Sequence, residues 1–333
     1  MSRETLTHLN TQTLIGYTEK RGNAWHYRAE AQGAESNHYA GAIPVPDVYR
    51  RLFDWTALEA EVHAVALTDD GVLNVTDPTR KAIVRSDTGA VLGIFKDGYQ
   101  VHRYDEWLVR NVESILDAEL KIGSAGLLRG GAVAWVQVEM EDTLTVEGVE
   151  FRPFLTAATS LDGSLASTYL TGAQVVVCDN TLSAALGTFD NKIKIKHSRH
   201  SLGKLADVRD ALAIVHGVGD AFSLQVQQLV SETVDAGRWD RFVGAYTAPS
   251  TDSKRAQTNA ADKAVALNRL WHHDERVTPW RGTAYGVLAA VNTWAHHEAE
   301  VRGADRATRN TERVVNGKID ELDAYTIKVL ATV

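Results

Sequence analysis

The spacing of apolar residues changes near Ser201, and this change limits the folds that the chain can adopt. Before Ser201, short apolar segments predict β-strands, whereas after it apolar residues recur every three or four positions, which predicts helices. The strand-like segments follow one another along the chain with one helical segment among them. We therefore predict an α+β fold, with an antiparallel sheet and packed helices over 1–200 and a mostly helical region over 201–333.

The first region contains the predicted strands. They are a short strand at 62–66, a hairpin of 82–85 and 91–95 around a turn at 86–89, and segments at 127–128, 132–138, 143–146, 151–158 and 174–177. Helical spacing of apolar residues predicts a helix over 104–120. The first forty residues have no clear period, and we expect mostly loops and short elements there.

The second region begins with a heptad pattern. Gly219 occupies one core position of the heptads, and the others are Leu205, Val208, Leu212, Val215, Phe222, Val226 and Leu229. We expect a long helix that packs on the sheet domain or on a neighbouring subunit, weakened or bent at Gly217 and Gly219. Further predicted helices cover 239–246, 260–271, 283–297 and 318–330.

The composition excludes several classes of protein. The single cysteine, Cys178, excludes an intrachain disulfide and an all-thiolate metal site. No apolar run approaches the roughly 20 residues of a membrane-spanning helix, and the polar first ten residues do not resemble a secretory signal. We expect a cytoplasmic protein without membrane anchor, metal or cofactor. Its net charge of −8 predicts a surface that on average repels nucleic acid.

One segment departs from this acidic balance. Residues 192–209 hold six lysines and arginines against one acid, Asp207. In a strand, Lys192, Lys194 and Lys196 would lie on one face about 6.6 Å apart, a row that can follow a phosphate backbone. The alternative interpretation is an edge strand that its lysines protect from aggregation. The candidate contacts in this basic segment are Lys192, Lys194, Lys196, His197, Arg199, His200 and Lys204.

Two residues outside the basic segment are further candidates for nucleic-acid contacts. Arg129 stands at a glycine-rich hairpin tip, where it could meet a phosphate, although a plain turn explains the same residues. Tyr99 is a candidate platform for stacking a base, and the alternative is a packing role.

Two polar motifs have an uncertain role. Ser160, Asp162 and Ser164 could offer hydroxyls and a carboxylate to a phosphate or a metal, but a turn between strands ending near Thr159 and restarting near Ser167 accounts for them. Asn180 and Thr181 are candidate N-caps of a helix whose apolar face begins at Leu182. Cys178 is interpreted as a small buried residue, and the histidine pairs lack the spacing of a metal site.

Several blocks together resemble a known family. They are Ala24–His26, Leu92–Tyr99, Ser160–Ser164 (S-x-D-G-S), Val177–Leu182 (V-C-x-N-T-L), Ile195–Arg199 (K-H-S/T-R), Arg281–Gly286 and Asn292. In this order they resemble the phage/plasmid-like protein family of unknown function, over about residues 24–330. The resemblance implies a mobile genetic element in a bacterial host cell. More distantly, the architecture is similar to the single-strand annealing recombinases of the RecT, Redβ and Erf type.

The sequence thus favours a non-catalytic protein that binds and anneals single-stranded DNA in recombination or replication as a homo-oligomer. Annealing requires cations on the phosphates and unobstructed base edges, and needs no catalytic group. One alternative is a metal-dependent nuclease or other phosphodiester-processing enzyme that uses Asp162, Asp179 and Asp190. Another is a protein–protein interaction module that acts on a host factor.

Overall fold

The computed structural model describes residues 10–21, 27–114, 116, 120–140, 142–175, 181–182, 192–195, 214–301, 306–315 and 318–333. The strands are β1 (Thr13–Ile15), β2 (Ala57–Thr68), β3 (Gly71–Arg85), β4 (Val91–Lys96), β5 (Leu120–Leu128), β6 (Val133–Met140), β7 (Leu144–Val146), β8 (Val149–Ser160), β9 (Ser167–Val175), β10 (Thr181–Leu182) and β11 (Lys192–Ile195). The helical elements are α2 (Thr18–Arg21), η1 (Ala29–Ala31), α3 (Val45–Val48), η2 (Tyr49–Phe53), η3 (Asp105–Arg110), α4 (Asn111–Glu113), η4 (Arg129–Gly131), α6 (Ile214–Ser231), α7 (Ala236–Tyr246), α8 (Lys254–His273), η6 (Thr278–Trp280), α9 (Ala284–Thr293), η7 (Trp294–Glu298), α10 (Arg306–Val315) and α11 (Lys318–Leu330).

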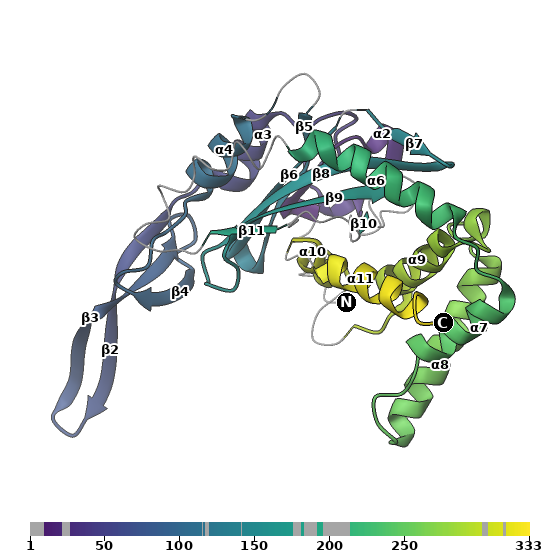
Figure 1. The fold of residues 1–333 in the computed structure, drawn as a ribbon. Helices are drawn as coiled ribbons and strands as arrows, with labels where there is room; N and C mark the ends of the chain where they lie inside the picture. The colour runs from purple at the N-terminus through teal and green to yellow at the C-terminus, as the bar shows by residue number, and fades with distance from the viewer. Residues whose placement is uncertain are drawn as a thin grey trace.

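Two antiparallel sheets organise these elements (Figure 1). The larger sheet has the order β1-β5-β6-β8-β9-β10, with β7 also paired to β8 and β11 to β9. The smaller sheet has the order β2-β3-β4, and its β2–β3 hairpin projects from the body. The helices of the C-terminal half gather at the opposite end of the molecule. The chain therefore has the predicted α+β fold class.

The central strands β6 and β8 are covered on both faces. Their register pairs Val136 with Ala157 and the next residues, Trp135 with Ala158, so alternate pairs point to opposite sides of the sheet. All four side chains are buried. We call the side that contains Val136 and Ala157 the α6 face, and the side that contains Trp135 and Ala158 the α10 face.

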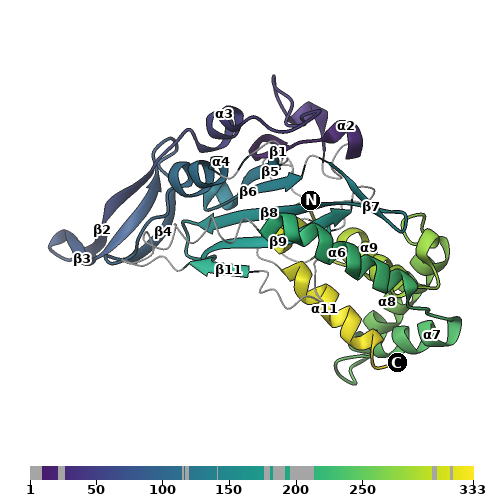
Figure 2. The ribbon, with the colours of Figure 1, turned by 45° about the horizontal axis from the view of Figure 1, so that its top comes forward.

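Apolar packing covers the α6 face. Near the projecting hairpin, η2, η3 and α4 contribute side chains such as Trp107 and Leu108 to a buried cluster with Val136 and Ala157. Towards the other end α6 crosses β8 and β9 (Figure 2), and the rings of Phe222 and Phe151 meet at 4.5 Å between centroids. A second cluster joins this helix to α7, α8, α9 and α11. The helical region thus packs directly on the sheet.

The α10 face is more polar. Val315 of α10 packs against Trp135 and Ala158 near one end of the strands. Further along, Glu139 and Arg152 are almost completely buried, 3.9 Å apart between their charged groups. Buried charged groups need polar neighbours, so the cover of this face cannot be entirely apolar.

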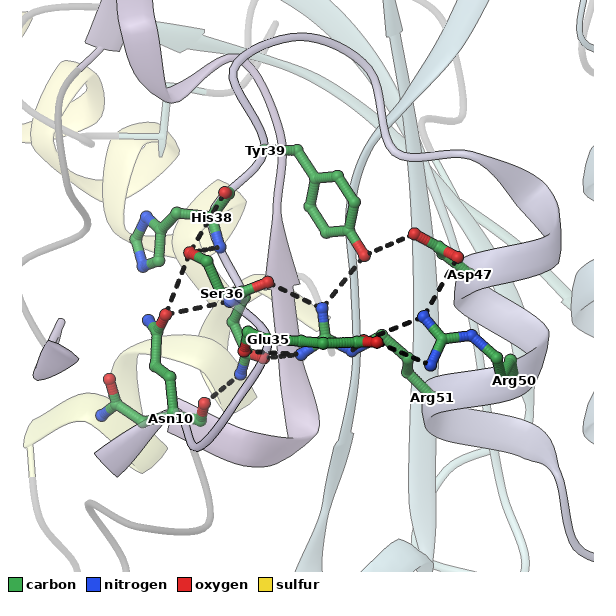
Figure 3. A network of polar contacts seen from close by, with 10 residues as sticks. Asn10, Glu35, Ser36, His38, Tyr39, Asp47, Arg50 and Arg51 are labelled. Carbon is green, nitrogen blue, oxygen red and sulfur yellow. Dashed lines mark hydrogen bonds and ion pairs between the residues drawn. The ribbon is translucent and has the colours of Figure 1, made fainter. Parts of the chain in front are cut away.

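A polar network attaches the loop that follows residue 28 to the α3–η2 helical segment (Figure 3). The guanidinium of Arg51 donates to the carbonyl of Ser36 at 2.7 Å and to the Tyr39 hydroxyl at 3.0 Å. The Tyr39 hydroxyl in turn donates to Asp47 at 2.9 Å. Arg50 contacts Glu35 and Asp47 at the exposed edge. The network fixes irregular backbone that carries few apolar side chains.

The structure confirms several predicted elements. The hairpin at 82–95, the turn at 160–166 and the helix over 318–330 are present at the expected positions. The segments at 132–138 and 151–158 form the interiors of β6 and β8, and helices occupy most of 239–297. Among the helices of the described residues, none combines the length and apolar character needed to cross a membrane.

Other expectations need correction. The predicted helix over 104–120 ends by Ser114, and Leu120 already begins β5. The first forty residues contain short elements as expected, and one of them, β1, pairs with the edge of β5. The strand predicted at 62–66 is present within β2, whereas α10 and the outer part of β3, residues 71–79, were not predicted. Helix α10 has few apolar residues, and the outer part of β3 lacks a buried face.

Gly219 lies where α6 packs against Leu144 and Pro153 of the sheet region. A Cβ atom at this position would lie 3.1 Å from Leu144 and 3.3 Å from Pro153, whereas one at Gly217 would meet nothing within 4 Å. Both positions are helical, so the expected weakening does not interrupt the helix. Gly219 therefore occupies a contact position of the heptad, and the absence of a side chain there allows the helix to pack close to the sheet.

We predict opposite effects at these two glycines. Gly219→Leu should lower the free energy of unfolding by about 1–3 kcal/mol through overpacking. Gly217→Ala should raise it by roughly 0.5–1 kcal/mol, because alanine favours the helix and meets no obstruction. Urea unfolding of both variants measures the difference. A Gly219→Leu protein as stable as the wild type would show that the contact with the sheet is not close.

Candidate anion-binding site

Part of the predicted basic strand is present as β11. It pairs antiparallel with β9, with Lys192 opposite Leu170, Ile193 opposite Tyr169 and Lys194 opposite Thr168. The predicted strand with lysines at 192, 194 and 196 is thereby confirmed over residues 192–195, where Lys192 and Lys194 occupy alternate positions. Five other members of the predicted segment lie outside the described residues, namely Lys196, His197, Arg199, His200 and Lys204.

The backbone register assigns the lysine positions to one side of the large sheet. Lys194 stands opposite Thr168, which stands opposite Ala158, which in turn pairs with Trp135. Residues opposite one another in antiparallel strands share a face. This row therefore belongs to the α10 face, and the isoleucine positions belong to the α6 face with Tyr169. Among the described strands, only β9 pairs with β11, which therefore lies at the edge of the described part of the sheet.

Helix α10 carries an arginine stripe that the sequence reading missed. Arg306, Arg309 and Arg313 are spaced three and four residues apart, so they lie along one side of the helix. All three side chains are partly buried. The spacing of the three arginines is visible in the sequence. The helix was not recognised, because it has too few apolar residues to show hydrophobic periodicity.

Arg309 caps the end of the preceding helical segment. Its guanidinium donates to the Ala295 carbonyl at 2.6 Å and to the Asn310 side chain at 3.0 Å, and Asn310 donates to the His296 carbonyl at 2.9 Å. Burial lowers the pKa of Arg309, and the neighbouring charges of Arg313 and Arg306 lower it further. A cation at carbonyl groups of a helix end is favourable, so this arginine has a structural role.

The surroundings of the stripe leave its positive charge uncompensated within the described part of the chain. There, none of its three arginines forms an ion pair with a carboxylate, and Arg306 Nη1 is buried without a hydrogen-bond partner. Burial lowers the pKa of His296 to about 3, with the charges of His297, Arg313 and Arg309 adding to the effect. Like charges kept together in this way create a local positive potential that an anion would neutralise.

A second group of predicted residues meets at the end of β8. Arg129, Asp162 and Tyr99 come from distant segments and lie together around the β8–β9 turn. Arg129 has a positive φ of 52° in its tight turn. Its guanidinium contacts Asp162 at 3.3 Å and Glu312 of α10 at 2.9 Å. Its charge is compensated by these carboxylates, and the contacts hold α10 against the sheet end.

The S-x-D-G-S motif builds the turn itself. Asp162 Oδ1 accepts from the Ser164 amide at 2.8 Å, and the Ser160 hydroxyl bonds with the backbone of Leu165. Burial acts to raise the pKa of Asp162, but hydrogen bonds from Ser164 and Ser160 and the charge of Arg129 outweigh it, and the net pKa is lowered. The interpretation as a turn thus accounts for every polar side chain of the motif.

Tyr99 is held against this turn. Its ring stacks on Phe95 at 3.9 Å between centroids, and its hydroxyl donates to the Ser160 carbonyl at 3.3 Å. Burial raises its pKa. One face of the ring proposed for base stacking is therefore occupied by Phe95.

The structure describes only some of the remaining candidate residues. Thr181 and Leu182 form β10, paired with Gln174 and Ala173 of β9, so the expected helix does not begin at Leu182. Asn180, Cys178, Asp179 and Asp190 lie outside the described residues. Within the residues that are described, no group of three or more histidine, cysteine or acidic side chains is placed to hold a metal ion.

Comparison with protein families places the chain. A sequence model described as "Domain of unknown function (DUF932)" matches residues 91–316. The chain belongs to this family. The matched region of this DUF932 protein contains the β8–β9 turn, β11 and the arginine stripe, whereas the β2–β3 hairpin lies before it. No curated protein and no solved structure matches the chain.

We predict that Asp162→Asn weakens the DUF932 fold in a pH-dependent manner. Loss of the charged acceptor should lower the free energy of unfolding by about 1 kcal/mol at neutral pH. Because the pKa of Asp162 is lowered in the folded protein, its contribution is present above the unfolded pKa and disappears as the pH falls through the folded pKa. Urea unfolding at several pH values should show the two proteins converging in acid. A constant difference would contradict this role.

His296 should make stability fall in mild acid. An unfolded histidine protonates near pH 6.5, whereas the folded pKa of His296 is about 3. Its contribution is complete above pH 6.5 and is lost as the pH falls towards 3. Between these values the wild type should lose up to about 1.4 kcal/mol per pH unit relative to His296→Gln. Parallel stability curves for the two proteins would contradict the buried, neutral state.

Proposed function

We propose that this protein binds single-stranded nucleic acid through the α10 face of its large sheet and promotes annealing without chemical catalysis. The observation that carries the proposal is the arginine stripe of α10, whose charge no described carboxylate compensates, beside a sheet face to which the lysine positions of β11 belong. A chain with net charge −8 that keeps these cations together has one favoured place for a polyanion.

The geometry suits backbone binding rather than readout of bases. Arginine and lysine neutralise phosphates and leave the base edges available for pairing with a second strand. The basic segment continues past β11 in the sequence through Lys196, Arg199 and Lys204, which lie outside the described residues. Arg129 contributes less directly, since its two carboxylate contacts position α10.

The biological setting is part of the proposal. The motif blocks that resemble phage and plasmid proteins favour a mobile genetic element in a bacterial cytoplasm, where recombination and replication expose single strands. The likeness to annealing recombinases extends only to a small antiparallel sheet with packed helices, and fold analogy alone does not establish an activity. Binding measurements therefore decide the matter.

The decisive experiment is the salt dependence of binding to a labelled oligothymidylate. Each phosphate contact contributes about −0.7 to the slope of log affinity against log salt, so Arg306→Gln/Arg313→Gln should make the slope less negative by roughly 1.4. Lys192→Gln/Lys194→Gln should have a similar effect. Fluorescence anisotropy across a salt series measures both variants. Arg309 is left intact because it caps η7.

Matched controls come from α8. Lys254 and Arg255 are exposed cations near the start of that helix, and Lys254→Gln/Arg255→Gln should leave the slope unchanged. A folded arginine variant with the wild-type slope would remove α10 from the site. Metal-dependent cleavage of the oligonucleotide that Asp162→Ala abolishes would instead favour the nuclease alternative.

A further inference from the structure

A cavity of about 400 Å³ opens between α8 and residues 247–253, which connect it to α7 and which we call the α7–α8 loop. The loop runs back alongside the first half of α8. At one end the centroid of the Tyr246 ring lies 3.9 Å from Lys263 Nζ, and at the other Thr251 bonds with Ser253, the N-cap of α8. Helices α7 and α8 lie at the end of the molecule away from the β2–β3 hairpin (Figure 1). The cavity has the size of a small-molecule site.

Small side chains of α8 form the floor of this cavity. Ala256 and Ala260 are four residues apart, so they lie on the same side of the helix, and both line the cavity. Pro249 lines it from the loop, and Ser250 and Asn259 add neutral polar groups. The middle of the cavity therefore suits an uncharged, slender part of a ligand.

One cation stands towards each end of the cavity. Lys263 lies between two rings, with Nζ 3.9 Å from the centroid of Tyr246 and 4.6 Å from that of Trp294 on η7. These cation–π contacts fix the position of the ammonium group. Arg255 lines the cavity near the start of α8. The two residues are eight positions apart, which corresponds to about 12 Å along the helix.

The charges of the two cations are uncompensated within the described part of the chain. Asp252 and Asp262 are close in sequence, but neither lines the cavity or forms an ion pair with either cation. Glu298 of η7 is already paired with Arg269. Burial lowers the pKa of Lys263 to about 8, and no carboxylate lies close enough to raise it again. A half-buried ammonium group without a counter-ion is stabilised when an anion binds beside it.

We propose that this cavity binds an elongated dicarboxylate, with one carboxylate at Lys263 and the other at Arg255. Each end offers a single positive charge, which one carboxylate neutralises, whereas a phosphate monoester carries nearly two negative charges. The chain between the two carboxylates lies over Ala256 and Ala260. A short dicarboxylate reaches only one of the two cations.

This inference is independent of nucleic-acid binding. The cavity belongs to α7 and α8, whereas the arginine stripe belongs to α10. Lys263→Met should therefore retain the salt slope of oligothymidylate binding, and Arg306→Gln/Arg313→Gln should retain the affinity for the dicarboxylate. Failure of one proposal leaves the other intact.

The first test is isothermal titration calorimetry with suberate, succinate and octanoate. Suberate is long enough to approach both cations, succinate is too short, and octanoate has the length of suberate with one carboxylate. Suberate should bind about tenfold more tightly than either of the others, because only suberate makes both charge-assisted contacts. Equal affinities for suberate and octanoate, or the absence of suberate binding, would overturn the proposal.

Variants of the two cations locate the ends of the ligand. Lys263→Met should weaken both suberate and octanoate about tenfold, and methionine can still pack between the two rings. Arg255→Gln should weaken suberate about tenfold and leave octanoate unchanged, because a single carboxylate gains more at the half-buried ammonium group. The matched control is Lys254→Gln, which changes an adjacent exposed cation outside the cavity and should bind suberate as the wild type does. Wild-type affinity for suberate in Lys263→Met would contradict the assignment.

A second pair of variants tests the cavity itself. Ala260→Leu places a larger side chain on its floor and should weaken suberate binding at least tenfold. Ala261→Leu makes the same change at an exposed position that does not line the cavity, and it should bind as the wild type does. Leucine is a strong helix former, so both proteins should fold, which circular dichroism verifies. If Ala260→Leu binds suberate normally, the ligand lies elsewhere and the proposal is wrong.

Discussion

Burial of both faces of β6 and β8 is the constraint on which the rest of the structure depends. A strand that alternates between two buried faces needs two covers, and the chain supplies them from distant segments. The helical segments around Trp107 and the helix with Phe222 share the α6 face. Helix α10, which arrives nearly at the end of the chain, contacts the other face through Val315. The last third of the sequence is therefore part of the same core as the sheet.

The cover of the α10 face differs from the cover of the α6 face because it contains charged side chains. Aromatic and aliphatic side chains cover the α6 face, and such packing provides no specific site for a ligand. On the α10 face, Arg129 joins Asp162 to Glu312 and fixes the helix, while Arg309 binds backbone carbonyls at the end of η7. Arg129 is paired with two carboxylates and Arg309 binds backbone carbonyls, whereas no described carboxylate forms an ion pair with Arg306 or Arg313. This division between positioning and uncompensated cations gives the proposed binding surface its physical basis.

The sequence by itself determined the fold class, the interior strands, most C-terminal helices and the turn at Ser160–Ser164, because these depend on local periodicity and turn chemistry. It also located β11, since alternation of lysine and isoleucine is a local pattern. Only the tertiary structure showed that Tyr99, Arg129 and Asp162 meet, that Arg129 is compensated, and that the arginines of α10 belong to the candidate site. Ion pairing and shared faces depend on contacts between residues far apart in sequence, such as Arg129 and Glu312, and no local pattern encodes which distant partner a charge will find.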